Sequence, residues 1–293
     1  VSELVTADGV LYWITNGVNG SELRRTKESD FLGTKEAKIR DFYTPVSQLT
    51  ADGQFVYFVA MDPSSNPGQQ MAIYRANTAD DGSTRIVSDV TSNTFGLRAS
   101  GGNLYWLTVT SANTTLFYAK GAVDQKIELA QGGITAFAVR DSTVYYFDEG
   151  RLYSATATEP SDKKKIDKVP WQSLPASLTF SEDHLIWLAG ESVNMLTIQD
   201  NGQFAYQEGL FPVKSPKAML AETQYLYVAN DSGTQITAWP YSGSQPIYIG
   251  SPSVATSTIA LSRQGLTPRF IYWTDNDPSV PKIERAPILL NTP

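Results

Sequence analysis

Ile271-Tyr272-Trp273-Thr274-Asp275, followed after a short loop by Ile283-Glu284-Arg285-Ala286, is the stretch that indicates how the whole chain is built. The first segment is an apolar and aromatic run typical of a buried strand, and the second has the pattern of a shorter strand. Looser copies of this strand–loop–strand unit recur along the chain. Internal repetition of this kind has to be tested first, because a missed repeat leads to the wrong fold.

An apolar residue followed by tyrosine and a second aromatic residue marks most copies. Seven such triplets or close variants occur, with central residues 40 to 48 positions apart. They are Leu11-Tyr12-Trp13, Val56-Tyr57-Phe58, Leu104-Tyr105-Trp106, Val144-Tyr145-Tyr146, Leu185-Ile186-Trp187, Leu226-Tyr227-Val228 and Ile271-Tyr272-Trp273. A short apolar strand and a turn come before each triplet. In the turn Ala7-Asp8-Gly9, Asp and Gly supply the positive φ angles of a tight hairpin.

A third strand follows each triplet, and a fourth is visible in most copies. We expect the fourth strands at Ala37 to Arg40, Thr84 to Val87, Lys126 to Leu129, Lys165 to Asp167, Phe204 to Gln207 and Pro246 to Ile249, and in the seventh copy only at Ile288-Leu289-Leu290. Four short antiparallel strands per repeat are typical of a β-propeller blade. The run from Leu104 to Leu107 is apolar on both faces, as expected for a sheet that its neighbours cover on both sides.

The sequence therefore predicts an all-β fold, a seven-bladed β-propeller of four-stranded antiparallel blades, in a single domain over residues 1–293. The predicted blades are residues 1–45, 46–92, 93–132, 133–173, 174–214, 215–254 and 255–293. Four of the six tryptophans share one register, and we expect them to pack between blades; they are Trp13, Trp106, Trp187 and Trp273. A pair of two-sheet sandwiches is the competing fold, but it would not require seven copies in register.

Composition excludes several classes of function. The net charge of −7 and the pI of about 4.8 make nucleic acid an unsuitable partner, because phosphate contacts need a concentrated basic surface. The only basic cluster, Lys163-Lys164-Lys165, is expected in a solvated turn. Without cysteine there are no disulfides and no thiolate metal ligands. No apolar run is long enough for a transmembrane segment. The chain opens at Val1, already inside a strand pattern, and either removal of a signal peptide or trimming of the sequence would explain that start. We expect an exported protein, secreted or periplasmic.

The last repeat resembles the YWTD repeat of the lipoprotein-receptor propellers, through Tyr272-Trp273-Thr274-Asp275 and Ile283-Glu284-Arg285-Ala286. Tyr105-Trp106-Leu107-Thr108 keeps the aromatic pair and the threonine, whereas most other copies keep only the aromatic pair. The receptor propellers have six blades and pack against cysteine-rich modules, and this chain has seven copies and no cysteine. As a whole it is similar to bacterial extracytoplasmic propellers, and that resemblance implies a scaffold or a binding module.

Catalytic groups are sparse. His184, the only histidine, follows Glu182-Asp183 and is expected in an exposed turn, and no serine lies in a Gly-x-Ser-x-Gly elbow. Carboxylates in loops could hold a cation only if several segments converged; the candidates are Asp62, Asp80, Asp81, Asp148, Glu149, Asp231, Asp275 and Asp277. Asp/Asn-rich tips are also ordinary hairpin chemistry. We therefore expect no catalytic residue, no metal ligand and no cofactor.

Loops between consecutive blades carry aromatic residues close to proline in three places. The residues are Tyr43, Trp171 and Phe211, beside Pro45, Pro170 and Pro212. We expect these loops on one face of the propeller, where rigid aromatic rings could bind a ligand. The alternative is that the rings fill gaps between the blade ends.

These features favour a non-enzymatic module whose loop face binds a protein or glycan partner. The first alternative is a propeller-type hydrolase or lyase with a cation in the central channel, which predicts carboxylates that converge from several blades. A further alternative is a structural ring of blades within a larger chain or assembly.

Overall fold

The computed structural model describes the chain except residues 1, 18–19, 32–36, 43–45, 63–69, 78, 80–81, 122–124, 174, 200, 215, 231, 253–255, 257, 265–266, 276–281 and 289–293. For residues 37–42, 160–161, 263–264, 267–269 and 275 it describes the backbone only. The chain is a seven-bladed β-propeller of antiparallel sheets, which confirms the predicted fold class. In the described part, helix is limited to one 3-10 turn, η1 (Glu28–Asp30). None of the described helical structure is long and apolar enough to cross a membrane.

Two compact units make up the chain. Unit 1 comprises Val1–Ser92, Ser232–Ile236 and Tyr248–Pro293, and unit 2 comprises Asn93–Asp231 and Thr237–Ile247. Blades 1, 2 and 7 belong to unit 1, blades 3, 4 and 5 belong to unit 2, and blade 6 is divided between them. Each sheet falls inside one of the seven residue intervals expected for the blades. The single-domain organisation stays a prediction.

In unit 1 each sheet is a meander of strands that are consecutive in the chain. Blade 1 consists of β1 (Glu3–Ala7), β2 (Val10–Gly17), β3 (Gly20–Lys27) and β4 (Ala37–Phe42). Blade 2 consists of β5 (Ser47–Asp52), β6 (Phe55–Met61), β7 (Met71–Asn77) and β8 (Ser83–Val90). Blade 7 has three described strands, β25 (Ile259–Gln264), β26 (Thr267–Asp275) and β27 (Lys282–Pro287). Its expected fourth strand, at Ile288-Leu289-Leu290, lies mostly outside the described residues.

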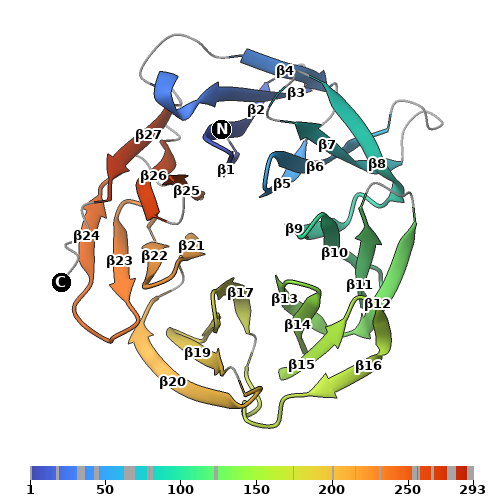
Figure 1. Ribbon diagram of the computed structural model, residues 1–293, viewed down its shortest axis with the longest axis vertical. Helices are drawn as coiled ribbons and strands as arrows, with labels where there is room; N and C mark the ends of the chain where they lie inside the picture. The colour runs from blue at the N-terminus through green and yellow to red at the C-terminus, as the bar shows by residue number, and fades with distance from the viewer. Residues whose placement is uncertain are drawn as a thin grey trace. The chain divides into compact units, whose positions relative to one another are not determined.

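Blades 3 to 6 repeat the same order. Blade 3 is β9 (Thr94–Ser100), β10 (Asn103–Val109), β11 (Thr114–Lys120) and β12 (Lys126–Gly132), and blade 4 is β13 (Ile134–Arg140), β14 (Thr143–Asp148), β15 (Arg151–Thr156) and β16 (Glu159–Lys165). Blade 5 is β17 (Ala176–Ser181), β18 (His184–Ala189), β19 (Ser192–Ile198) and β20 (Phe204–Pro212), and blade 6 is β21 (Ala218–Ala221), β22 (Tyr225–Ala229), β23 (Ile236–Pro240) and β24 (Ile247–Gly250). In unit 2, β9, β13 and β17 are the inner strands and β12, β16 and β20 the outer ones (Figure 1).

The cores lie between successive blades. In unit 2 one apolar cluster joins blade 3 to blade 4, a second joins blade 4 to blade 5, and a third joins blade 5 to blade 6. Trp187 is fully buried in the second cluster, and Trp13 belongs to a cluster between blades 1 and 7 of unit 1. The expected packing of tryptophans between blades is confirmed for these two. A strand that is covered on both faces needs apolar residues at successive positions, which explains the uninterrupted aromatic triplets.

The first and last blades pack directly against each other in unit 1, because β1 contacts β25. On its other side β1 contacts β5 of blade 2. At this junction Ser262 Oγ donates a hydrogen bond to the Glu28 carboxylate. The guanidinium of Arg285 lies over the Phe270 ring at 4.4 Å from its centroid, and over the Phe31 ring at 5.3 Å. Burial raises the pKa of Glu28, against the opposing effects of the Ser262 hydrogen bond and the Arg285 charge. The junction therefore combines an apolar cluster with a partly buried polar contact.

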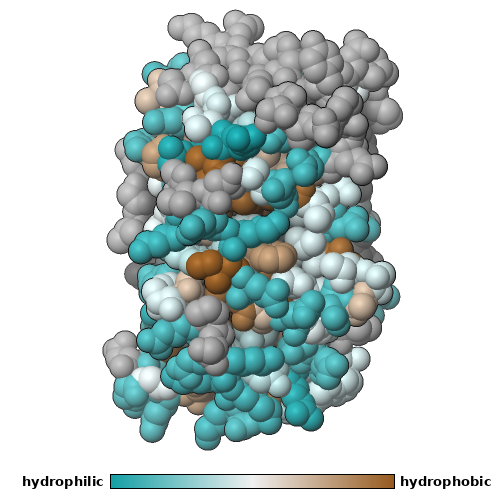
Figure 2. All heavy atoms as spheres, turned by 90° about the vertical axis from the view of Figure 1, so that its right-hand side faces the viewer, coloured by the Kyte–Doolittle hydropathy of each residue, from teal (hydrophilic) through white to brown (hydrophobic). Residues whose placement is uncertain are grey.

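The outer strand of blade 4 differs from the prediction. It was expected at Lys165 to Asp167, and Lys163-Lys164-Lys165 was expected in a turn, but β16 covers Glu159–Lys165 and contains the lysine run. Lys164 is 70% exposed and forms an ion pair with Asp162. Lysines suit an outer strand because charged side chains discourage pairing with another chain. Hydrophilic side chains also dominate the face shown in Figure 2, where apolar ones form small separate patches.

Candidate functional site

The structure places the predicted aromatic residues differently from one another. Trp171 is 65% exposed, the largest exposed fraction among the bulky apolar side chains of the described residues. Phe211 is 4% exposed, and its ring stacks on that of Trp239 at a centroid distance of 4.8 Å. Phe211 therefore offers no open ring face, which agrees with the gap-filling alternative at this position. Tyr43 lies outside the described residues. Ligand binding at these positions stays a prediction, with Trp171 as its exposed member.

Trp171 lies in the loop between β16 and β17 and rests on the turn between β14 and β15. Its indole Nε1 donates a hydrogen bond of 2.9 Å to the carbonyl oxygen of Glu149. The amide of Gln172 donates one of 2.8 Å to the carbonyl oxygen of Gly150. Glu149 and Gly150 have φ angles of +48° and +78°, as a two-residue hairpin turn requires. The loop is thus fixed to blade 4 by a backbone bond and an indole bond. We call Glu149, Gly150, Trp171 and Gln172 the Trp171 site.

Gly150 is required by contact as well as by backbone angle. A Cβ atom at this position would lie 2.3 Å from the carbonyl oxygen of Gln172 and 2.5 Å from Nε1 of Trp171. Neither distance is compatible with a side chain. The absence of a side chain at Gly150 therefore lets the loop approach the turn closely.

Gln172 anchors the other side of the loop to blade 5. Its side chain is 5% exposed, and its Oε1 accepts a hydrogen bond of 3.0 Å from Asn194 Nδ2. Nε1 of Trp187 lies 3.5 Å from the same oxygen, and the side-chain nitrogen Nε2 of Gln172 lies 3.5 Å from the hydroxyl of Tyr206. Buried amides need such partners, because an unpaired one carries the full cost of desolvation. The loop that carries Trp171 is therefore held by polar contacts to two blades.

Asn194 explains an irregularity in the same blade. The pairing of β19 with β20 shifts register between Val193 and Met195, so β20 bulges opposite Asn194. Oδ1 of Asn194 accepts a hydrogen bond of 2.9 Å from the amide of Gly209, whose φ is +62°. A bulge leaves a backbone group without a strand partner, and here a side chain supplies that partner. One buried asparagine thus links the bulge to Gln172.

Two of the candidate carboxylates are engaged in ion pairs within their own blades. Asp148, at the end of β14, accepts a hydrogen bond from the Gly133 amide at 2.9 Å and lies 3.1 Å from Lys163 Nζ of β16. Asp62, which directly follows β6, lies 2.6 Å from Arg85 Nη1 of β8 and is 6% exposed. Each carboxylate therefore pairs with a basic residue on the outer strand of its own blade.

Metal ligands do not gather in the described part of the chain. Among those residues no group of three or more His, Asp or Glu side chains could hold a metal ion. Some of the candidates lie outside the described residues, namely Asp80, Asp81, Asp231 and Asp277, as does the side chain of Asp275. Burial raises the pKa of Tyr105 to about 12 and also raises the pKa of Tyr146 and of Tyr227. Each of these phenols therefore holds its proton more tightly than an exposed tyrosine does.

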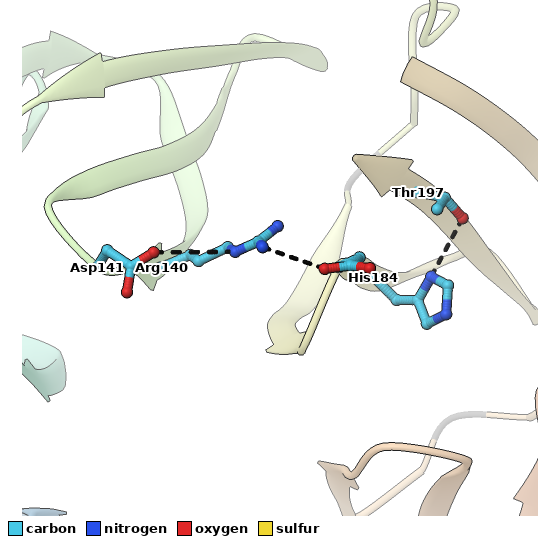
Figure 3. A network of polar contacts seen from close by, with 5 residues as sticks. Arg140, Asp141, His184 and Thr197 are labelled. Atoms are coloured by element: carbon cyan, nitrogen blue, oxygen red, sulfur yellow. Dashed lines mark hydrogen bonds and ion pairs between the residues drawn. The ribbon is translucent and has the colours of Figure 1, made fainter. Parts of the chain in front are cut away.

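His184 belongs to a polar network at the hairpin turns that join the first and second strands of blades 4 and 5. These turns lie at the opposite end of the blade 4 strands from the β14–β15 turn of the Trp171 site. It is the first residue of β18 and is half-buried, so its expected position in an exposed turn is wrong. Its Nδ1 lies 3.1 Å from Thr197 Oγ1, and its ring meets Tyr241 edge to face. Arg140 Nη2 donates a hydrogen bond of 3.1 Å to Asp183. Figure 3 shows Arg140 reaching toward blade 5, while the imidazole is turned toward Thr197.

This network connects blades rather than forming a catalytic triad. Arg140 joins blade 4 to blade 5, and the contact of His184 with Tyr241 joins blade 5 to blade 6. The partner of His184 Nδ1 is the hydroxyl of Thr197. In a catalytic triad of the Ser-His-Asp type, a carboxylate accepts the hydrogen bond from Nδ1. The contacts are those expected of groups that stabilise the packing of neighbouring blades.

Comparisons with known proteins agree on the fold. No family model matches the sequence, and no curated protein matches it. Among solved structures, the β-propeller domain of Cps50 (Swd1) from Myceliophteria thermophila is similar with a TM-score of 0.68, at 11% identity over 97% of this chain and 96% of that one. An oligogalacturonate lyase in complex with manganese has a TM-score of 0.67, at 9% identity over 98% of this chain and 88% of that one.

TolB from Acinetobacter baumannii has a TM-score of 0.57, at 13% identity over 84% of this chain and 65% of that one. At these identities the similarities show a β-propeller and nothing finer. They include proteins with and without enzymatic names, so function has to be argued from the site itself.

Sequence reasoning identified Trp171 but missed the residues that position it. Gly150, Gln172 and Asn194 were not singled out. The two-residue spacing between β14 and β15 was a usable sign of a turn that needs glycine. Gln172 and Asn194 gave no sign, because their role depends on a contact between residues that are distant in sequence.

Proposed function

We propose that the protein is a non-enzymatic β-propeller binding module that presents the Trp171 site to a protein or glycan partner. The observation that carries the proposal is the exposed indole on a loop that two blades hold in place. A ring fixed before binding loses little conformational freedom on contact, so more of the contact energy appears as affinity. Tryptophan is also among the residue types most enriched at binding hot spots.

The proposal includes a location outside the cytoplasm, secreted or periplasmic, in a bacterium, and a YWTD-like character of the repeat. The last part rests on the sequence Tyr272-Trp273-Thr274-Asp275. The fold shared with TolB of Acinetobacter baumannii is compatible with such a location. Fractionation of the producing cell tests it, since recovery of the protein with cytoplasmic markers would contradict this part.

Arrays of glycans and of peptides test the binding role. Trp171→Ala removes the exposed indole, and Tyr248→Ala is the matched control because Tyr248 is 56% exposed and belongs to β24 of blade 6 instead of the Trp171 loop. We expect at least one class of ligand to bind wild type and the control equally, and to lose about tenfold or more in affinity with Trp171→Ala. Equal binding by both variants, or no ligand in either array, would refute the proposal. Circular dichroism shows whether each variant is folded.

The second candidate function is a hydrolase or lyase with a cation in the central channel. No cluster among the described residues favours it, because Asp62 and Asp148 form ion pairs with Arg85 and Lys163. A calcium- or manganese-dependent rise in melting temperature would favour this candidate, since a ligand that binds only the folded state stabilises it.

A further inference from the structure

We propose that the ligand of the Trp171 site is a neutral glycan, one sugar ring of which stacks on the exposed face of the indole. This inference rests on the binding role proposed above and names its substrate class. The first argument is what the indole can still offer. Its only hydrogen-bond donor, Nε1, is engaged by the Glu149 carbonyl, and its edge lies against Gly150. With that donor engaged, the indole offers a ligand only apolar ring surface, so the ligand must present an apolar surface to it.

The area of the exposed apolar surface argues against a protein partner at this site. A specific protein interface buries about 800 Å² on each side and has an apolar centre. A single aromatic side chain supplies only about 150 to 250 Å². The other bulky apolar side chains exposed in the described residues belong to strands of blades 3 and 6, not to the Trp171 loop; they are Val109, Ile127, Ile247 and Tyr248. Among the described residues, Trp171 is thus the only exposed bulky apolar side chain of its loop, and one ring of this size matches one sugar ring.

The surroundings of the indole argue against charged ligands. The turn and the loop carry charges of both signs, because Glu149, Arg151 and Lys168 all have exposed side chains. Opposite charges offset one another, so the site favours neither an acidic nor a basic ligand. A cation would be attracted to the ring face, but recognition of ammonium groups uses cages of several aromatic rings. Among described residues the only other largely exposed aromatic side chain is Tyr248 of blade 6.

Hydroxyl-rich ligands fit the exposed polar residues of the same turn and loop. The Glu149 carboxylate can accept hydrogen bonds from sugar hydroxyls, and Ser173, exposed two positions beyond Trp171, can donate or accept one. The rigid attachment of the loop through Gln172 keeps these groups in a fixed relation to the ring. A flat apolar face with adjacent acceptors and donors is what a sugar ring, apolar on its faces and polar at its rim, requires.

Affinity electrophoresis tests the inference, because polysaccharide in a gel reveals weak binding as slower migration. The neutral probes are a mixed-linkage β-glucan, a galactomannan and a xylan, and the acidic probe is polygalacturonate. We expect at least one neutral polysaccharide to retard wild type and Tyr248→Ala, and polygalacturonate to retard neither. Trp171→Ala should migrate as in a gel without polysaccharide. Trp171→Phe should keep part of the retardation, because it retains a ring face but loses the hydrogen bond to Glu149.

The outcomes separate the two proposals. No retardation by any neutral polysaccharide, or retardation that Trp171→Ala does not reduce, overturns the glycan inference. If a peptide array then shows binding that depends on Trp171, the proposed binding role stands and only its ligand class is wrong. If neither glycans nor peptides bind in a Trp171-dependent way, both proposals fall. Melting temperatures of the variants within a few degrees of wild type show that loss of binding is not loss of fold.

Discussion

A Gly150→Ala substitution should detach the Trp171 loop from the β14–β15 turn. The φ angle of +78° at Gly150 places it in the left-handed region, which costs a residue with a side chain about 1 to 2 kcal/mol. The new methyl group would also meet the Gln172 carbonyl oxygen at 2.3 Å, so the loop has to move. Movement breaks the bonds from the Gln172 amide and from Trp171 Nε1, each worth about 1 kcal/mol. The expected loss of stability is about 3 to 4 kcal/mol.

Gly202→Ala is the matched control for this substitution. Gly202 has a φ of +75° in the turn between β19 and β20, and no heavy atom lies within 4 Å of the position its Cβ would take. Its cost should be the backbone strain alone, about 1 to 2 kcal/mol. The difference between the two variants therefore isolates the close approach of Gly150 to the loop.

Urea denaturation measures both free energies of unfolding, and hydrogen exchange at the Gln172 amide reports on the loop itself. Exchange should be faster in Gly150→Ala and unchanged in Gly202→Ala. Acrylamide quenching of tryptophan fluorescence adds a second measurement. It reports mainly on Trp171, which is 65% exposed, whereas the four tryptophans of the shared register are at most 5% exposed. If both variants lose the same stability and Gln172 stays protected, the contact does not hold the loop and the account of the site is wrong.

Asn194→Ala should cost about 2 kcal/mol by urea denaturation, because it removes the partner of the Gly209 amide and leaves Gln172 Oε1 with only the longer contact to Trp187. A loss below about 0.5 kcal/mol would contradict this. The raised pKa of Glu28 means that the folded state binds its proton more tightly than the unfolded state, so stability should fall as pH rises from 4.5 through the folded-state value. Glu28→Gln should flatten that part of the melting profile, and an unchanged slope would count against the assignment. Burial raises the pKa of Tyr105 from 10.0 to about 12, so the stability that its protonated phenol contributes should be lost as pH rises from 10.0 through about 12. Tyr105→Phe should weaken the alkaline unfolding that tyrosinate absorbance follows.

The second strands of the blades were predictable because burial on both faces leaves a clear mark on the sequence. Leu104 to Leu107 has no polar position, and it forms the buried centre of β10. The outer strands carry no such mark, since one edge and much of their surface meet solvent. The lysine run of β16 therefore read as a turn, although the same residues pair with β15 as an edge strand.

The site was predictable only in part, because similar local sequences have different surroundings. Trp171 and Phe211 both stand next to proline, in segments that the sequence predicts as loops between blades. Phe211 is still part of β20, pairs with Val193 and packs on Trp239, whereas Trp171 lies beyond the end of β16. Which of the two is buried depends on where the outer strand ends. The sequence does not define the end of an outer strand, because such a strand lacks a regular pattern of apolar residues.

The repeat itself supplies a comparison that bears on the role of Trp171. The Val213 amide donates to the Glu191 carbonyl at 3.0 Å, just as the Gln172 amide donates to the Gly150 carbonyl at 2.8 Å. Pro212, the last residue of β20, is therefore the structural equivalent of Trp171, and both positions are exposed. The backbone contact that shapes the loop thus does not require an aromatic residue at this position. Since the fold is satisfied by proline there, most of the indole surface at the same point of blade 4 is available for the binding role proposed above.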